Sequence, residues 1–228
     1  MTTKHSSAPA ADTRPRLLDL FCGAGGAAMG YYRAGFDVVG VDIKPQSRYP
    51  FEFHQGDALE YCAAHGAEFD VIHASPPCQA YTMAQNAAKN AHNHPDLVAV
   101  TRITLQATGK PWIIENVVGA PLVDPFMLCG LSFGLQVKRH RLFETSFFVL
   151  APHCQCKDAD YFVIFGHEVR NRRHGQAAGR KNNIAAGRKA MGIDWMTRAE
   201  LSQAIPPAYT ECIGTQLLQA LNHEHETR

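Results

Sequence analysis

One short stretch determines how the rest of the chain is organised: Leu17-Leu18-Asp19-Leu20-Phe21-Cys22-Gly23-Ala24-Gly25-Gly26. Its apolar first half is typical of a short buried strand, and residues 27–34 after the glycines have helical character. A strand, a glycine turn and a helix form the first unit of a nucleotide-binding α/β sheet, because glycines let the backbone approach a cofactor and the helix N-terminus faces it. A tight turn without a ligand is the alternative at this point.

Two acidic residues follow at positions that favour an adenosine-type cofactor. Asp42 ends a second predicted strand, 36–42, about 20 residues after the glycine turn starts, where a carboxylate can accept hydrogen bonds from a ribose. Asp57 lies at the end of a third predicted strand, within 53–58. It is a candidate acceptor for an adenine amino group, the N-cap of a helix over 58–64, or both.

A fourth predicted strand, 69–74, leads into the stretch Ser75-Pro76-Pro77-Cys78-Gln79. The two prolines fix φ and remove two backbone donors, so this turn is stiff and cannot continue the sheet. Because open α/β sheets place their chemistry at the carboxyl ends of strands, Cys78 is a candidate nucleophile. Burial as an ordinary core cysteine is the alternative. The polar residues 80–95 predict a loop with marginal helix, which is either a lid or an exposed helix.

Further charged residues are expected at the ends of later elements. A helix is predicted over 96–109, followed by a buried strand from Trp112 that ends at Glu115. A carboxylate at the end of a buried strand is destabilising unless it has a partner or a function. Arg139 and Arg141 alternate on another predicted strand, so we expect both side chains on the same face.

The C-terminal part has a weaker pattern. A strand is predicted at 161–165, and 166–189 carries seven Lys or Arg residues against one acid, which indicates a flexible basic segment that either binds phosphates or is simply solvated. Thr197 to Glu200 can form a capping box. Residues 205–209, with two prolines, are expected to interrupt regular secondary structure before a final amphipathic helix over 210–221.

Composition bounds the class of protein. The 228 residues, 46% hydrophobic and 19% charged, suit one sizeable globular domain. The net charge of +1 excludes a chain that is basic throughout, so any nucleic-acid surface must be local. No apolar run reaches membrane-spanning length, and the N-terminus lacks the apolar core of a signal peptide. Seven dispersed cysteines favour a reducing cytoplasm over a disulfide framework.

One group of residues has the composition of a zinc site. His153, Cys154 and Cys156 lie close together, with His167 and His174 further along the chain. The Cys-x-Cys spacing is tighter than the common finger spacing, so no metal site is predicted.

Taken together, these stretches resemble the DNA cytosine-5 methyltransferase family, over about 17–150 and 191–221. The similar motifs stand in the family's order: Asp19–Gly26 for S-adenosylmethionine, Pro76–Gln79 for catalysis, Glu115–Val117 for the catalytic glutamate, Arg139–Arg141 for the paired arginines, and Gln203–Pro207 with Ile213-Gly214 for the C-terminal completion of the cofactor site. The chain departs from the family at Val137, where a Gln is common, at Ser202-Gln203, which replace Gly-Asn, and in the very short region 145–190.

The resemblance implies an α/β fold of the S-adenosylmethionine-dependent methyltransferase (Rossmann-like) type, a mixed sheet with helices on both faces and a very small target-recognition insertion. The expected division is a disordered leader (1–16), a catalytic and cofactor-binding core (17–150), a short basic target-recognition segment (151–190), a C-terminal helical part that returns to the core (191–221) and a tail (222–228).

The resemblance also assigns residues to three groups. The expected catalytic residues are Cys78, Glu115, Arg139 and Arg141. The expected cofactor-binding residues are Phe21, Gly23, Ala24, Gly25, Gly26, Asp42, Ile43, Asp57, Ala58, Pro76, Ala204 and Ile205. The expected nucleic-acid-binding residues are Gln79, Arg170, Arg172, Arg173, Arg180 and Lys181.

The implied reaction is transfer of a methyl group from S-adenosylmethionine to C5 of cytosine in double-stranded DNA, through a covalent adduct of Cys78 with C6 of a flipped-out base. The short recognition region implies a short recognition sequence or low specificity, and the compact size is reminiscent of phage or mobile-element members. Restriction-modification is a further role that the resemblance implies. A cytoplasmic monomer is expected, with a dimer left open. Two alternatives stay open: an RNA (tRNA-like) cytosine-5 methyltransferase, and a non-catalytic DNA-binding accessory protein of the same fold.

Overall fold

The structure, a computed structural model, describes residues 14–77, 96–156, 160–165, 168–172 and 183–226. Its main sheet has seven strands in the order β3-β2-β1-β4-β5-β7-β6. The first five in sequence are parallel: β1 (Arg16–Leu20), β2 (Asp37–Asp42), β3 (Glu52–Gln55), β4 (Val71–Ala74) and β5 (Trp112–Asn116). Strand β7 (Arg141–Thr145) runs antiparallel to β5, and β6 (Phe126–Leu128) antiparallel to β7. The predicted mixed α/β sheet is confirmed.

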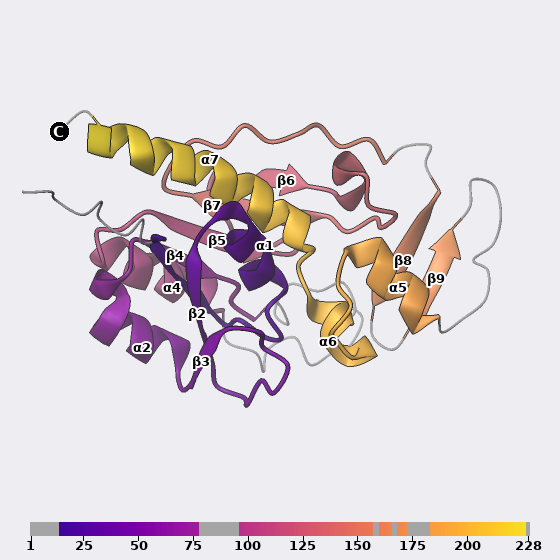
Figure 1. The fold of residues 1–228 in the computed structure, drawn as a ribbon, viewed down its shortest axis with the longest axis horizontal. Coiled ribbons are helices and arrows are strands. Elements are labelled where there is room, and N and C mark those ends of the chain that lie inside the picture. The colour runs from indigo at the N-terminus through magenta and orange to yellow at the C-terminus, as the bar shows by residue number, and fades with distance from the viewer. Residues whose placement is uncertain (1–13, 78–95, 157–159, 166–167, 173–182, 227–228) are drawn as a thin grey trace, which may run out of the picture.

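Helices cover both faces of this sheet (Figure 1). Helices α1 (Gly26–Ala34) and α7 (Pro207–Glu226) pack with one core, and α2 (Ala58–His65) and α4 (Val98–Ala107) pack with the other. Side chains of a strand alternate between the faces, so Leu17 faces the first core and Leu18 the second. The apolar runs of the strands follow from burial on both faces. Short 3-10 turns, η1 (Gly66–Glu68) and η4 (Gly130–Phe133), complete the core.

Helices α1 and α7 approach each other closely (Figure 1). A Cβ atom at Gly30 would lie 2.0 Å from the Thr210 hydroxyl, which donates a hydrogen bond to the Ala27 carbonyl at 2.7 Å. The predicted break at 205–209 is wrong in part, because α7 begins at Pro207, where a proline is compatible with the first helical turn. The same helix runs to Glu226, so most of the expected tail is helical.

A small third layer lies at the right of Figure 1. It contains the hairpin of β8 (Tyr161–Phe165) and β9 (Glu168–Arg172) with α5 (Ile184–Met191) and α6 (Arg198–Gln203). Its own apolar core consists mainly of Val137, Ile164, Ala190, Met191, Ile193, Met196 and Leu201. The predicted strand at 161–165 and the capping box of Thr197 and Glu200 are confirmed.

Three expectations about irregular segments are corrected. The basic segment 166–189 forms β9 and α5 where it is described, because β9 pairs along β8 and the Asn183 side chain caps α5. The expected leader overlaps the fold, since Arg16 begins β1 and the Asp37 N–H donates to the Pro15 carbonyl at 2.9 Å. The expected strand through Arg139 is shorter, because β7 begins only at Arg141.

None of the described helices combines the length and apolar character that a membrane-spanning helix needs. The predicted loop 80–95 lies outside the described residues, as do residues 1–13.

Candidate active site

The parallel strands deliver the predicted residues to one edge of the sheet. The glycine turn, Asp42, Pro76 and Glu115 lie at or next to the carboxyl ends of β1, β2, β4 and β5, which share one direction. Strand β7 runs the opposite way, so its first residue, Arg141, enters at the same edge. The topology therefore gathers residues that are separated by up to half the chain.

The glycine turn has an unusual backbone that leaves space above it. Phe21 has a φ of 56°, a left-handed conformation that is strained for a residue with a side chain, and Gly23 follows with a φ of 50°. The Gly23 N–H donates to Oδ2 of Asp42 at 3.0 Å, which fixes the turn against β2. A Cβ atom at Gly23 would meet no described atom within 4 Å, so a ligand can approach the backbone there.

The two acidic residues hold local structure. Asp42 also accepts from the Lys44 N–H at 2.9 Å, and the neighbouring Ile43 is 66% exposed although apolar. Asp57 caps α2, accepting from the N–H groups of Leu59 and Glu60, so the predicted N-cap is confirmed. Ala58 is buried as the first residue of α2. Their contacts with a ribose and an adenine remain predictions.

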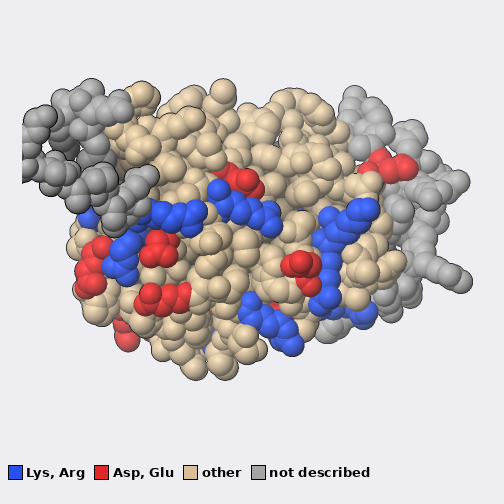
Figure 2. Space-filling view, in the orientation of Figure 1, with Lys and Arg blue, Asp and Glu red and all other residues tan. Residues whose placement is uncertain are grey.

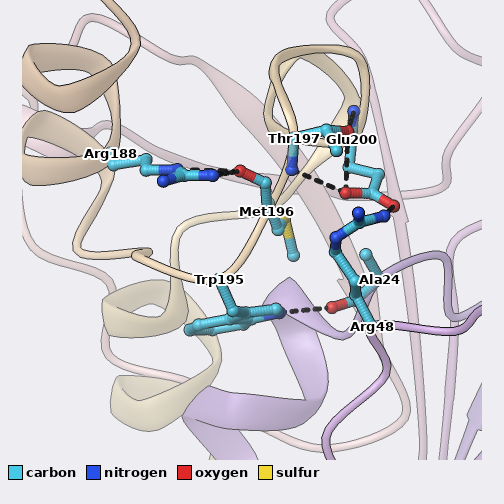
Figure 3. A network of polar contacts seen from close by, with 7 residues as sticks. All are labelled: Ala24, Arg48, Arg188, Trp195, Met196, Thr197 and Glu200. Atoms are coloured by element: carbon cyan, nitrogen blue, oxygen red, sulfur yellow. Dashed lines mark hydrogen bonds and ion pairs between the residues drawn. The ribbon is translucent and has the colours of Figure 1, made fainter.

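The C-terminal part of the chain closes over the glycine turn, as Figure 3 shows. The Trp195 indole N–H donates to the Ala24 carbonyl at 2.8 Å. A Cβ atom at Gly26 would lie 2.5 Å from the Ile205 carbonyl oxygen, so only glycine allows this approach. Ala204 and Ile205 are both buried here. The structure thus brings the two ends of the predicted cofactor site together.

A second polar network fixes this cover in place (Figure 3). The Arg188 guanidinium donates to the Met196 carbonyl at 2.8 and 2.6 Å. Arg48, from the loop after β2, pairs with Glu200 at 3.3 Å. Glu200 in turn accepts from the Thr197 N–H at 2.6 Å, and these contacts help to lower its pKa although burial opposes them.

The turn that leads to the candidate nucleophile is anchored by a buried amide. The Asn116 side chain donates to the carbonyl of Pro76 at 3.0 Å, and both residues are buried. The Pro-Pro turn is therefore fixed to the end of β5, next to Glu115. Cys78 and Gln79 lie outside the described residues.

Glu115 and Arg141 form an ion pair at this edge. Nε of Arg141 lies 3.0 Å from Oε1 of Glu115, without the alignment of a hydrogen bond. Burial raises the pKa of Glu115, while the guanidinium groups of Arg141 and Arg139 oppose this rise. Arg141 also donates to the carbonyl of His140 at 2.8 Å, which limits where its side chain can point.

Behind Glu115 lies a buried chain of polar side chains. Nδ1 of His73 is hydrogen-bonded to the Tyr31 hydroxyl at 3.0 Å, and its Nε2 to the Ser75 hydroxyl at 2.9 Å. Burial lowers the pKa of His73 to about 3, so the imidazole is neutral at physiological pH. The Ser75 hydroxyl also favours the ionised form of Glu115. This chain links α1 to the turn that carries Cys78.

Arg139 occupies a different place from Arg141. Its guanidinium donates to the carbonyls of Ile164 at 3.1 Å and Ser202 at 2.6 Å. Its own carbonyl accepts from the Tyr209 hydroxyl. Arg139 therefore ties β8, α6 and α7 together, and its charge also acts on Glu115. The two arginines were expected to point to one face of a strand; this is wrong, because Arg139 precedes β7.

The unusual residues at 137 and 202–203 have structural roles of their own. Val137 is fully buried and its backbone pairs with Phe162 of β8. Ser202 supplies the carbonyl that binds Arg139, and Gln203 is exposed at the end of α6.

The predicted nucleic-acid-binding residues are only partly described. Arg170 and Arg172 belong to β9, while Arg173, Arg180 and Lys181 lie outside the described residues. Figure 2 shows basic side chains around α5, where Arg188 and Lys189 occupy the last helical turn, and acidic side chains among basic ones over the rest of this face. On this face the basic side chains are thus not spread evenly.

Three residues of this site were not among the predicted site residues: Asn116, His73 and Ser75. A buried histidine within the apolar stretch Val71–Ala74 and an asparagine directly after Glu115 were the available indications, since buried polar groups need partners.

About half of the chain is similar in sequence to known DNA methylases. Residues 15–122 match the model of the family described as C-5 cytosine-specific DNA methylase. The type II methyltransferase M.XorII of Xanthomonas oryzae pv. oryzae is 31% identical over 123 residues, which are 47% of this chain and 29% of the relative. The type II methyltransferase M1.HphI of Haemophilus parahaemolyticus is 33% identical over 121 residues, 44% of this chain and 32% of the relative. The alignments therefore span only about a third of each relative.

Solved structures share the fold over most of the chain. A protein described as a DNA modification methyltransferase encoded within an E. coli prophage gives a TM-score of 0.63 at 14% identity, covering 91% of this chain and 99% of its own. The S. pombe Dnmt2 methyltransferase gives a TM-score of 0.63 at 14% identity, and the match covers 92% of this chain and 100% of that structure. The Entamoeba histolytica methyltransferase EhMeth gives a TM-score of 0.63 at 13% identity, and the match covers 92% of this chain and 99% of that structure.

Proposed function

We propose that this chain is a member of the C-5 cytosine-specific DNA methylase family and transfers a methyl group from S-adenosylmethionine to C5 of cytosine in DNA. The observation that carries the proposal is the buried Glu115–Arg141 pair, 3.0 Å apart, beside the anchored turn that ends in Cys78. A carboxyl group, a guanidinium and a thiol are the groups that covalent activation of a cytosine ring requires.

The residues at the carboxyl edge fit the methyl donor. The open space above Gly23 admits a ligand to the backbone, and the exposed apolar side chain of Ile43 suits the face of an adenine ring. Asp42 would hold the ribose and Asp57 the adenine amino group, each through a carboxylate that already orients local N–H groups. When bound, S-adenosylmethionine supplies an electrophilic methyl group on a sulfonium.

The first step makes the cytosine ring nucleophilic. The Cys78 thiolate forms a bond to C6, the C5=C6 electron pair becomes a C4=C5 double bond, and the N3=C4 pair moves to N3. Glu115 gives N3 a proton as charge builds there, and its raised pKa keeps the carboxyl group protonated to a higher pH. Arg141 holds the O2 side of the ring.

The second part restores the aromatic ring. The C4=C5 pair of the adduct would form the new bond from C5 to the methyl carbon, while the bond from that carbon to the sulfonium sulfur breaks and its electron pair stays on sulfur. The N3 lone pair would restore the N3=C4 double bond at the same time. Loss of the C5 proton to a base then returns an electron pair to C5=C6, and the Cys78 thiolate leaves C6. The N3 proton returns to Glu115, so the enzyme ends in its starting state, and the ring becomes 5-methylcytosine.

The substrate must leave the duplex to reach these groups. The ion pair is largely buried, with side chains 16% and 8% exposed, so a stacked base cannot contact it. Flipping out the base costs a few kcal/mol, which backbone contacts must offset. Lys189 in the last turn of α5 and the basic residues of β9 would supply phosphate contacts, so binding should weaken as salt rises.

The proposal is tested by transfer of a labelled methyl group from S-adenosylmethionine by the full chain. Matched DNA duplexes, single strands and tRNA serve as acceptors, and Cys78→Ala is the control. The expected product is 5-methylcytosine in DNA, lost with Cys78→Ala. Labelling of tRNA but not DNA would contradict the proposed substrate, and no transfer to any acceptor would contradict the enzyme assignment.

A further inference from the structure

Three cysteines and one histidine meet at a place that the proposed reaction does not use. They are Cys129, His140, Cys154 and Cys156, and their Sγ and imidazole nitrogen atoms all lie within 4.8 Å of one another. The four residues come from three separate segments: the residue after β6, the residue before β7, and the stretch that follows β7. Such convergence of soft ligands is unusual for packing alone.

The distances between the donor atoms suit a tetrahedral metal ion. Nε2 of His140 lies 3.5 Å from Sγ of Cys154 and 3.4 Å from Sγ of Cys156, and the two Sγ atoms are 3.2 Å apart. With Zn–S bonds of about 2.3 Å and Zn–N bonds of about 2.0 Å, tetrahedral geometry separates the ligand atoms by roughly 3.5–3.8 Å. Small adjustments would bring the four donors to these separations.

The backbone around the four residues is already held in place. Cys129 is fully buried and is the N-cap of η4. The Ser132 hydroxyl of η4 donates to the carbonyl of His153 at 2.8 Å, so the segment with Cys154 is tied to the segment with Cys129. His140 lies directly before β7, and its carbonyl accepts a hydrogen bond from Arg141 at 2.8 Å. A preformed set of ligands lowers the cost of binding a metal ion.

We propose that Cys129, His140, Cys154 and Cys156 bind one zinc ion. Three thiolates and one imidazole form a complete tetrahedral set, which leaves no open position for a substrate or a water molecule. The site is therefore structural. Softer thiolate ligands in a tetrahedral arrangement favour zinc over magnesium or calcium.

The zinc site would stabilise the start of β7, where the arginines lie. His140 stands between Arg139 and Arg141, and its carbonyl accepts the hydrogen bond from Arg141. Holding the His140 ring would fix this carbonyl and so the direction from which Arg141 approaches Glu115. The four ligands would also join β6, β7 and the entry to the small layer.

The direct test is the metal content of the full chain, produced in zinc-supplied cells with a tag that binds no metal and purified under reducing conditions. About one zinc per chain is expected for the wild type and for Cys212→Ala, a free cysteine of α7 outside the cluster. Cys154→Ala/Cys156→Ala should lose the zinc. Replacement of zinc by Co²⁺ in the wild type should give the visible absorption of a tetrahedral thiolate complex.

Three results of the metal measurements would overturn the proposal. They are wild-type protein without zinc that also fails to bind Co²⁺, zinc retained by the double variant, and iron or copper in place of zinc. The wild-type measurements decide the question even if the double variant does not fold. A disulfide between Cys154 and Cys156 in the reduced, zinc-supplied protein would also contradict it, since their Sγ atoms could then not bind the ion.

Discussion

Nε of Arg141 lies 3.0 Å from Oε1 of Glu115, although the two residues come from antiparallel strands, β7 and β5. The strands pair Asn116 with Leu142, which sets the two charged side chains at the same edge of the sheet. Oε1 of Glu115 is buried and accepts no aligned hydrogen bond from a described residue. It is therefore ready for a donor or a proton on the substrate.

Glu115→Gln should reduce methyl transfer by about 10²–10⁴-fold, because the amide cannot exchange a proton with N3. Since burial raises the pKa of Glu115, the wild-type rate should fall as pH rises through that pKa, and Glu115→Gln should lose this alkaline limb. The pH dependence of kcat/KM measures both the loss of rate and the loss of the alkaline limb. The matched control, Glu68→Gln at an exposed glutamate, should keep the wild-type profile. An unchanged rate in Glu115→Gln would remove this residue from the mechanism.

His73 should make the protein sensitive to acid. Its pKa is about 3 in the folded protein and about 6.5 in the unfolded protein. Between these two pH values the unfolded state therefore binds more protons than the folded state. Stability should therefore fall as pH drops from about 6.5 towards 3. His73→Gln should reduce this loss relative to the wild type, as measured by urea unfolding at pH 7.5, 6 and 5. If His65→Gln, at an exposed histidine, reduced it equally, burial of His73 would not be the cause.

Asp19 should make the protein less stable as pH rises, which is the opposite of the effect of His73. Burial raises its pKa from 3.8 to about 8, with the Tyr49 hydroxyl 3.4 Å away as a weak compensation. The folded state thus keeps a proton that the unfolded state has released, and stability should fall as pH rises from about 4 to 8. Asp19→Asn should gain stability over the wild type at pH 8 and much less at pH 5, in urea unfolding. No gain at pH 8, or the same gain from Asp37→Asn at an exposed site, would argue against a protonated Asp19.

Substitution of Arg139 should mainly lower stability, whereas substitution of Arg141 should mainly lower activity. Arg139→Lys cannot span the Ile164 and Ser202 carbonyls with a single ammonium, so it should lose about 1–3 kcal/mol of stability. Arg141→Lys should change stability less but lower kcat more, because its guanidinium faces Glu115. Thermal unfolding and methyl-transfer rates on the same samples provide the comparison. Equal loss of activity without destabilisation in both variants would show a shared catalytic role instead.

The sequence alone predicted the elements whose pattern is local. Buried strands appear as apolar runs, and the caps at Asp57 and Thr197 follow from residues two or three positions apart. The order of parallel strands then places Asp42 and Glu115 at one edge without further information. The start of α7 was predicted too late in the sequence. A pair of prolines can mark either the end of one element or the first turn of the next helix, and here Pro207 begins α7.

Contacts between distant segments could not be predicted in this way. Arg139 binds carbonyls 25 and 63 positions away, and main-chain partners carry no sequence pattern. The proposed zinc ligands were missed for a similar reason. The sequence places Cys154 and Cys156 near His153, with His167 and His174 further along the chain, whereas the antiparallel pairing of β6 and β7 brings Cys129 and His140 to them.

The central claim is that Cys78 attacks C6 of cytosine in DNA. It is tested most directly by incubating the full chain and S-adenosylmethionine with a duplex that contains 5-fluorocytosine, whose C5 cannot lose a proton. The prediction is a covalent protein–DNA complex that survives denaturing electrophoresis, with the modified peptide carrying the base on Cys78. No complex with the wild type, or an equal yield with Cys78→Ala, would contradict the account.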